Sequence, residues 1–197
     1  PYPIQNLSDC DDTAVLVKAL NSNDRDFDIQ AAGTAMRFLT AFLAKVVGEW
    51  TITGTERMKN RPIKILVDAL NALGARIEYM EKEGFPPLRI WGSALQGGEI
   101  SLSGGVSSQY ISALLMVAPL MEKGLVLHLE GNIISKPYIQ LTLQLMKQFG
   151  VQSEWKGSTI RVTPQEYQPI PFTVESDWSA ASYWYEMMAL SRQAEIQ

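Results

Sequence analysis

The stretch PIKILVDALNALGARIEYM (62–80) decides the fold class, because it joins a helical pattern to a strand pattern. Its apolar residues recur every three or four positions as far as Leu73, which is the spacing of one buried helix face. Gly74 is the kind of residue that ends a helix, and a short strand follows at 76–80. After a loop with one glycine and two prolines, a second strand is expected at 88–91.

A second copy of this pattern lies 75 residues further along the chain. The segment PYIQLTLQLMKQFG (137–150) again runs from a proline, expected at the first helical position, to a glycine, and a hairpin turn follows at 156–158. The two helices align on one proline and two leucines: Pro62 with Pro137, Leu66 with Leu141, and Leu70 with Leu145. An internal repeat of this length predicts compact, pseudo-symmetric units that bury their helices against sheets.

Further elements complete each unit: helix-length apolar segments at 33–48 and 107–120, and short strands at 50–54 and 125–129. The repeated order is strand, helix, strand, helix and hairpin. The fold class is therefore α/β with repeated βαβαββ units.

The parts outside the two repeats are less regular. An earlier, incomplete unit fits at the start of the chain, with 13–20 as its second helix. We expect the acidic stretch 24–28 to form a surface loop, and 165–171 to be a connection that leaves the domain. Because the chain starts at Pro1 without a methionine and ends soon after a helix-like stretch (183–190), we expect it to be a piece of a longer protein.

Composition excludes several classes of function. The 197 residues are 46% hydrophobic and carry 17 basic against 21 acidic side chains, so a sizeable core is expected and a general nucleic-acid binder is not. No apolar run approaches the roughly 20 residues that span a bilayer. Cys10 has no partner for an internal disulfide, which suits a reducing cytoplasm. His128, the single histidine, alternates with leucines on the polar side of a strand, so neither a zinc site nor a serine–histidine triad is expected.

Three places combine small or polar residues with a helix start, where backbone N–H groups and the helix dipole favour an anion. The first is 31–37, centred on Gly33, although small residues there equally suit close packing. The second is 55–62, where a run of cations also suits a solvated loop. Cations beside a helix N-terminus nevertheless favour an anionic ligand, and Arg57 has the fork geometry that clamps a phosphate or carboxylate.

The third place combines two helix starts. Ser107 and Ser108 are ordinary N-cap residues, but with Ser135 they also suit a phosphate-sized pocket. Gln109 supplies a neutral donor and acceptor for a ligand hydroxyl, and Tyr138 is placed to line a ring-shaped ligand. The residues alone therefore predict an anion-binding α/β repeat domain for a phosphorylated small molecule.

The segments that carry these features resemble the enolpyruvyl transferase family, and within it the members that act on shikimate 3-phosphate. The matching segments are AGTAMR (32–37), ERMKNRP (56–62), LVDALNALGA (66–75), FPPLRI (85–90), SSQYISALLM (107–116), SKPYIQLTLQLMK (135–147) and VESDWSAASY (174–183). The resemblance implies two domains, each of three βαβαββ units in a pseudo-threefold arrangement, with the active site between them. On this basis 1–173 is the substrate-binding domain, its first unit incomplete, and 174–197 is the crossover into a second domain that is otherwise absent.

The implied reaction transfers the enolpyruvyl group of phosphoenolpyruvate to the 5-hydroxyl of shikimate 3-phosphate and releases phosphate, with no metal or organic cofactor. The implied phosphoenolpyruvate-binding residues are Gly33, Arg57 and Gln109. The implied shikimate 3-phosphate-binding residues are Ser107, Ser108, Gln109, Ser135 and Tyr138. Arg37 is expected to support the turn at Gly33. The resemblance also implies a cytoplasmic enzyme of chorismate and aromatic amino acid biosynthesis, whose partners are these two substrates and the missing domain, not nucleic acid or membrane.

Parts of the family pattern have no counterpart in this chain. The family's opening lysine–serine segment would precede Pro1, and its aspartate general base, with further basic and acidic residues, would follow Gln197. Asp177 belongs to the crossover helix and is not a substitute. We therefore expect no catalytic residue here and no turnover by this chain alone. Three other interpretations stay open: an enolpyruvyl transferase acting on UDP-N-acetylglucosamine, a non-catalytic phosphate-binding module, and one domain of a fused pathway polypeptide.

Overall fold

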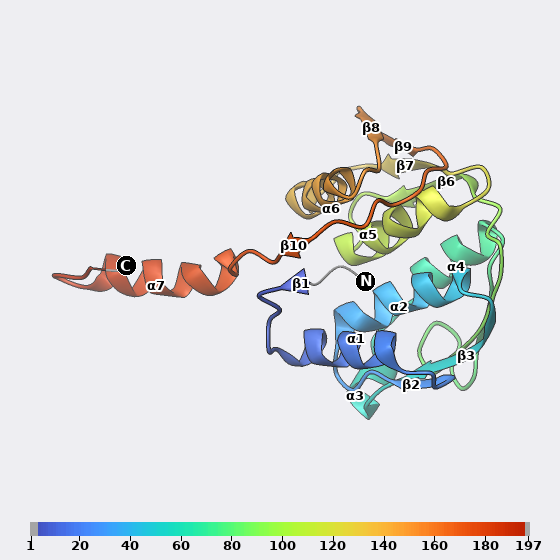
Figure 1. The fold of residues 1–197 in the computed structure, drawn as a ribbon, viewed down its shortest axis with the longest axis horizontal. Helices are drawn as coiled ribbons and strands as arrows, with labels where there is room; N and C mark the ends of the chain where they lie inside the picture. Colours follow the sequence, from blue (N-terminus) through green and yellow to red (C-terminus); the bar gives the residue numbers. More distant parts are fainter. Residues whose placement is uncertain (1–3, 196–197) are drawn as a thin grey trace. The chain divides into compact units, whose positions relative to one another are not determined.

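The computed structural model describes residues 4–195, which fall into two units. The larger unit, Ser8–Pro169, holds both repeats and every candidate site residue. The smaller one combines residues 4–7 with 170–195. Both can be followed in Figure 1. The two ends of the chain, to which the expectations at Pro1 and Gln197 refer, lie outside the described residues.

The first repeat is a complete unit built around a four-stranded sheet. Its elements are β2 (Asp26–Asp28), α2 (Gly33–Lys45), β3 (Gly48–Thr53), α3 (Glu56–Lys59), α4 (Lys64–Ala72), β4 (Arg76–Tyr79) and β5 (Leu88–Gly92). The strand order is β2-β3-β5-β4. The β2–β3 pair is parallel, with Phe27 opposite Ile52, and the other two pairs are antiparallel. A parallel pair needs a long crossover connection, and here α2 provides it.

The second repeat has the same topology. Its elements are β6 (Gly98–Ser103), α5 (Ser108–Val117), a 3₁₀ turn (Ala118–Leu120), β7 (Leu125–Glu130), α6 (Lys136–Gln148), β8 (Ser153–Lys156) and β9 (Thr159–Val162). The strand order is β6-β7-β9-β8, and again only the first pair, β6–β7, is parallel. The predicted α/β fold with repeated βαβαββ units is confirmed.

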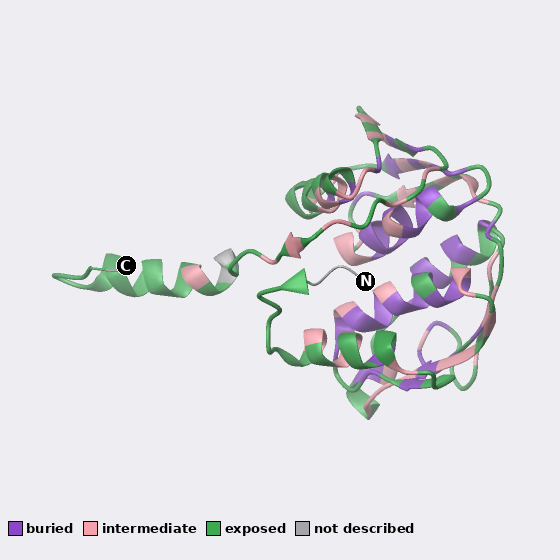
Figure 2. Ribbon diagram, viewed as in Figure 1, coloured by how far each residue is buried: buried purple, intermediate pink, exposed green. Residues whose placement is uncertain are grey.

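The first helices of the two repeats, α2 and α5, form the core of the larger unit. Both are apolar nearly all round, as helices buried on every side are, and they pack against each other. Figure 2 shows both as largely buried, between the two sheets. The buried Thr40 hydroxyl donates to the Met36 carbonyl oxygen at 2.7 Å, so this polar group is satisfied inside the core.

The second helices, α4 and α6, are related by a spacing of 76 residues, one more than expected. Their ends show it most directly. The Ala75 N–H donates to the Leu70 carbonyl oxygen at 2.9 Å, and the Val151 N–H donates to the Met146 carbonyl oxygen at 3.0 Å. These two bonds close the helices in the same way, 76 residues apart.

Burial along the two helices confirms the correction. Leu66 is fully buried, but its expected counterpart Leu141 is 53% exposed. Leu141 instead corresponds to Ile65, which is 41% exposed, while Ile63 and Ile139 are both fully buried. A shift of one residue rotates a helical position by about 100°, which moves a leucine from the buried face to the surface. The alignment on prolines and leucines was therefore wrong by one position.

Three smaller expectations also need correction. The segment 55–61 is not a plain loop, because it contains α3. Pro62 lies two residues before α4, and Pro137 is the second residue of α6. The acidic stretch is not entirely loop: Asp26 and Asp28 belong to β2, with exposed side chains on either side of the buried Phe27. That alternation is typical of a strand with one buried face.

The helix expected at 13–20 is present as α1 (Asp11–Asn21), which packs against α2. It leads into β2 after only residues 22–25, without the hairpin that ends each complete unit. At the other end, the connection after β9 remains attached to this unit as far as Pro169. The Gln165 amide bonds to the backbone of Gln152, and the Tyr167 hydroxyl donates to the Met116 carbonyl oxygen at 2.8 Å.

The smaller unit consists of a short parallel pair and a helix. In β1 (Ile4–Gln5) and β10 (Phe172–Thr173), Ile4 lies opposite Phe172. The helix α7 (Trp178–Leu190) includes the expected helical stretch. Several of its large apolar side chains are exposed: Tyr183, Trp184, Tyr185, Met187, Met188 and Leu190. Within the described part of the chain, no helix combines the length and hydropathy needed to cross a membrane.

Candidate functional site

The first part of the candidate site is the start of α2. Gly33 is its first residue, and the N-cap Ala32 has no side-chain hydrogen bond to offer. A methyl group on Gly33 would lie 2.2 Å from Nη1 of Arg61, so the Arg61 guanidinium rests directly against this glycine. The helix dipole and a guanidinium together make this helix start electropositive. One carboxylate is already close, because the Thr34 N–H donates to Oδ1 of Asp12 at 3.2 Å.

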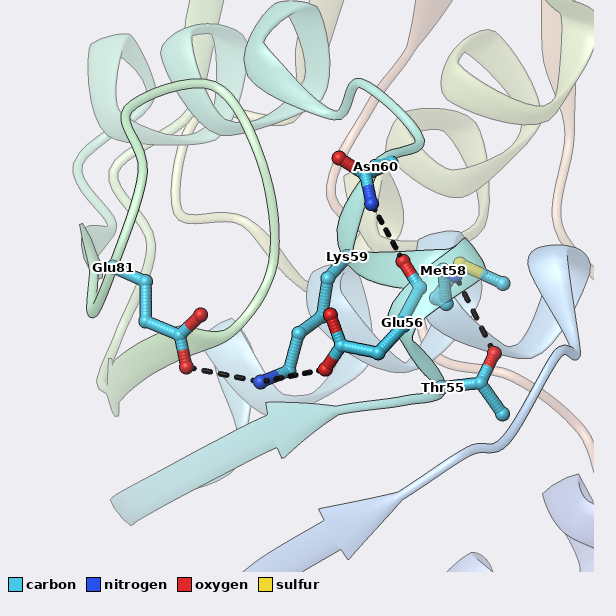
Figure 3. Close-up of polar contacts among 6 residues, drawn as sticks. All are labelled: Thr55, Glu56, Met58, Lys59, Asn60 and Glu81. Carbon is cyan, nitrogen blue, oxygen red and sulfur yellow. Dashed lines mark hydrogen bonds and ion pairs between the residues drawn. The ribbon is translucent and has the colours of Figure 1, made fainter.

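The second part is the single helical turn α3, shown in Figure 3. Met58 is buried and anchors the turn to the core. Its N–H donates to the Thr55 hydroxyl oxygen at 3.4 Å, and the Asn60 amide donates to the Glu56 carbonyl oxygen at 2.8 Å. Arg57 is exposed on the same turn.

These two parts face a small cavity. It has a volume of about 140 Å³ and is lined by Ala31, Arg57, Met58 and Arg61. That is the space of several water molecules, at roughly 30 Å³ each. Two guanidinium groups in one cavity suit an anion of phosphate size, because each offers parallel N–H donors. The sequence segment 56–62 contained Arg61, but only the structure shows that it lies against Gly33.

Arg37 holds this region together from below. Its buried guanidinium donates to the Gly33 carbonyl oxygen at 2.9 Å and to the Pro62 carbonyl oxygen at 3.4 Å. The Tyr110 hydroxyl donates to the same Pro62 oxygen at 2.6 Å. Burial lowers the pKa of Arg37 from its usual value. These contacts agree with the expected supporting role, because they tie the start of α2 to the segment that follows α3.

The third part is the start of α5. Ser107 is its N-cap, and its hydroxyl oxygen accepts from the Gln109 N–H at 3.4 Å. The side chain of Gln109 points to the neighbouring helix, where its amide donates to the Thr34 hydroxyl oxygen at 3.1 Å. Ser108 is the first helical residue. Thr34 was not among the predicted site residues, since nothing in its spacing distinguishes it from its small neighbours.

The start of α6 lies next to that of α5. The Ile134 N–H donates to the Gly104 carbonyl oxygen at 3.3 Å, which joins the two preceding loops, and the Ser112 and Thr142 hydroxyls are 2.7 Å apart. Ser135 is the N-cap of α6 but makes no capping bond with its side chain. Tyr138, in the first turn, is 61% exposed.

The structure thus connects the predicted residues in two groups. Gly33 and Arg57 border the arginine-lined cavity, and Gln109 links the α2 start to the α5 start. Ser135 and Tyr138 lie on the neighbouring α6, attached through helix packing and not through a direct contact with the other site residues.

His128 lies outside the site, on a sheet. It contacts the Thr159 hydroxyl at 3.0 Å and the Glu99 carboxylate at 2.5 Å. Its neighbours Leu127 and Leu129 are buried, which confirms its position on the polar side of β7. Within residues 4–195, no three histidine, cysteine, aspartate or glutamate side chains are grouped as a metal site would require.

Comparison with known proteins extends the observations. A family model described as EPSP synthase (3-phosphoshikimate 1-carboxyvinyltransferase) matches residues 4–197. The 3-phosphoshikimate 1-carboxyvinyltransferase of Bacteroides fragilis (strain ATCC 25285) is 63% identical over 193 residues, which are 98% of this chain and 47% of that protein. The protein of the same name from Pseudoalteromonas atlantica is 49% identical over 156 residues, covering 78% of this chain and 36% of that protein.

A solved structure shows the same fold. The EPSP synthase from Acinetobacter baumannii superposes with a TM-score of 0.71 at 22% identity, covering 83% of this chain and 36% of that one. The chain spans about half the length of the Bacteroides fragilis relative. Since the family model covers almost the whole chain, the resemblance seen in the sequence is confirmed: this chain belongs to the EPSP synthase family.

Proposed function

We propose that the complete protein transfers the enolpyruvyl group of phosphoenolpyruvate to the 5-hydroxyl of shikimate 3-phosphate, releasing phosphate, and that this chain supplies half of the active site. The observation that carries the proposal is the connection between two helix starts beside the arginine-lined cavity. Gln109 bridges them through Thr34 at 3.1 Å, so one anion at each helix start would be adjacent to the other. The protein would then serve chorismate and aromatic amino acid biosynthesis in the cytoplasm.

Phosphoenolpyruvate would bind at the start of α2. Gly33 leaves backbone N–H groups uncovered there, and Arg57 would grip the phosphate in the cavity that it shares with Arg61. Charge-assisted hydrogen bonds from guanidinium to phosphate are among the strongest polar contacts in proteins. Gln109 would contact the same substrate from the neighbouring helix.

Shikimate 3-phosphate would bind at the starts of α5 and α6. The hydroxyls of Ser107, Ser108 and Ser135 would donate to its phosphate, and the exposed ring of Tyr138 would lie against the carbocycle. Gln109 would lie between the two substrates. Hydroxyl donors suit this second anion, because a neutral set of donors orients a phosphate without adding more cations near the first one.

The chain's own residues bind and orient, and the proton-transferring groups would come from the second domain. Two anionic substrates repel each other, so positive groups and helix N-termini must offset that repulsion before the 5-hydroxyl approaches the enol carbon. The reaction would proceed by addition and elimination through a tetrahedral intermediate. We place the substrate-binding domain at 1–173 and the crossover at 174–197, and expect the isolated chain to be inactive.

Calorimetric titration of this chain with shikimate 3-phosphate tests the proposal. Saturable binding that disappears with plain shikimate and weakens in Ser108→Ala supports it. Ser101→Ala, an exposed serine on β6, is the matched control and should bind like wild type. Binding that is equal for shikimate and shikimate 3-phosphate would contradict the assignment of the serines to the phosphate.

A second experiment tests the expected division of labour. Phosphate release from both substrates is followed for the chain alone and for a heat-treated sample. Equal rates are expected, and turnover above the control would show that the chain carries its own acid and base. UDP-N-acetylglucosamine should neither bind nor displace shikimate 3-phosphate; displacement would favour the other branch of the enolpyruvyl transferases.

A further inference from the structure

The loop between β4 and β5 makes two ion pairs with different partners. Nζ of Lys59 lies 3.0 Å from Oε1 of Glu81, and Nζ of Lys64 lies 2.8 Å from Oε1 of Glu83. Lys59 belongs to α3, which carries Arg57, whereas Lys64 is the first residue of α4. Two carboxylates of one loop, two residues apart, therefore attach it to two separate helices.

The turn α3 needs such outside support. A helix of four residues is unstable by itself, because nucleation costs more than its few hydrogen bonds return. Of its local contacts, the Thr55 cap is long at 3.4 Å and the Lys59–Glu56 pair is 3.7 Å. Glu81 supplies a shorter contact from 22 positions away in the chain, as Figure 3 shows.

The environment of the two lysines differs. The Lys59 side chain is 24% exposed, against 50% for Lys64, so solvent screens the Lys59–Glu81 pair less. The hydrogen bond to Glu81 is also the main reason why the pKa of Lys59 is raised above its usual value.

We propose that Glu81 is a positioning residue for the phosphate side of the site: by holding Lys59 it fixes α3, and so directs Arg57 into the cavity that it shares with Arg61. This inference rests on the proposed function, because it assumes that Arg57 grips a substrate phosphate. Glu81 itself lies outside the residues that line the cavity.

Substitution by glutamine separates positioning from plain electrostatics. Glu81→Gln removes a negative charge near a cationic cavity, so Coulomb attraction alone would strengthen anion binding. Positioning predicts the opposite sign, because an unpaired Lys59 loosens the turn and Arg57 with it. Glu83→Gln is the matched control, since it makes the same charge change on the same loop but releases Lys64 and leaves α3 untouched.

The first measurement is amide hydrogen exchange of the 197-residue chain without ligand. The Lys59 N–H, which donates to the Thr55 carbonyl oxygen at 3.0 Å, reports on α3. We expect about two- to fivefold faster exchange in Glu81→Gln, the range of a partly exposed ion pair, and unchanged exchange in Glu83→Gln. Unchanged exchange of α3 in Glu81→Gln would overturn the inference whether or not the chain binds a substrate.

The second measurement is titration of the same variants with phosphoenolpyruvate. We expect affinity two- to fivefold lower in Glu81→Gln, within the same range, and unchanged or slightly higher in Glu83→Gln. In a Lys59→Met background, Glu81→Gln should have no further weakening effect, because the interaction it removes is already gone. Stronger binding in Glu81→Gln, or an equal loss in Glu83→Gln, would overturn the positioning role.

The two proposals fail separately. If the wild-type chain binds neither phosphoenolpyruvate nor inorganic phosphate, the proposed half-site is wrong. The link from Glu81 through Lys59 to α3 is then decided by hydrogen exchange alone, with the same supporting and contradicting results.

Discussion

The two junctions that lead into the second helices occupy the same place in their repeat units but carry different chemistry. Before α4, the chain forms a helical turn anchored by the buried Met58, with Arg57 and Arg61 around a cavity. Before α6, it forms a polar loop that ends at the uncapped Ser135. The scaffold thus sets the position, and the side chains decide whether that position offers guanidinium or hydroxyl donors.

The helices after these junctions differ as well. In α4, Leu66, Val67 and Leu70 are buried, whereas the buried residues of α6 are Ile139 and Met146. The same strand order therefore coexists with unequal burial of the equivalent helix. Four substitutions would test these differences, and the largest effects are expected in the first repeat.

The greatest loss of stability is expected for Leu66→Ala. Leu66 is fully buried, and truncating a core leucine costs about 3 kcal/mol of unfolding free energy through lost transfer energy and the cavity left behind. Leu141→Ala, at an exposed position of α6, should cost less than about 0.5 kcal/mol. Denaturant unfolding of both variants measures the difference. Equal losses would mean that the leucines of α4 and α6 share one environment, contrary to the one-residue shift.

The next effect concerns the arginine turn. Arg57→Ala should weaken phosphoenolpyruvate binding by about 10- to 100-fold, because a charge-assisted hydrogen bond is worth roughly 1.5–3 kcal/mol. Arg89→Ala removes an exposed arginine on β5 and serves as the matched control. Calorimetry with phosphoenolpyruvate measures both, and a similar loss in the two variants would indicate a general charge effect instead of a specific grip.

A smaller effect is expected at the hydroxyl junction. Ser135→Ala should weaken shikimate 3-phosphate binding by about fivefold, since a hydrogen bond from a neutral donor contributes about 1 kcal/mol. Phosphoenolpyruvate binding should not change. If Ser135→Ala weakens phosphoenolpyruvate more than shikimate 3-phosphate, the assignment of the two junctions to two ligands is reversed.

The smallest effects distinguish two buried tyrosines at neutral pH. The Tyr167 hydroxyl donates to the Met116 carbonyl oxygen at 2.8 Å, so Tyr167→Phe should cost about 1 kcal/mol. Within the described chain the buried Tyr79 hydroxyl has no hydrogen-bond partner, so Tyr79→Phe should leave stability unchanged or slightly higher. Denaturant unfolding at pH 7 measures both, and a larger loss for Tyr79→Phe would show that its hydroxyl is paired.

The same variants have a defined pH dependence. Burial raises the pKa of Tyr79 and of Tyr167 to about 12. Between about pH 10, where an unfolded tyrosine ionises, and pH 12, the unfolded state binds fewer protons than the folded state, so stability falls as pH rises. Each phenylalanine variant should show a shallower fall than wild type over this range. An unchanged slope in both would contradict the raised pKa values.

Much of the fold was predictable because it depends on local patterns. Gly74 and Gly150 ended the two helices as expected, both with positive φ, a conformation that glycine adopts without steric cost. The register of the helices was not predictable from the leucines, since Leu141 and Leu145 repeat at helical spacing whichever face is buried. The neighbours of a helix, not its own sequence, decide which face that is.

The site was predictable in part for the same reason. The helix starts at Gly33 and Ser107 could be located from small and polar residues, because such residues favour those positions. The turn α3 could not, because four residues are too few for a periodic pattern and its support comes from Met58 and Glu81.

The amino-acid sequence by itself determined the order of elements, their repetition and the positions of the helix starts, since these follow from spacing over a few neighbouring residues. Only the tertiary structure decided that Arg61 lies against Gly33, that Gln109 reaches Thr34 and that Glu81 holds Lys59. Each of these contacts joins residues at least 22 positions apart in the chain. Their geometry depends on how whole helices pack, which no local pattern encodes.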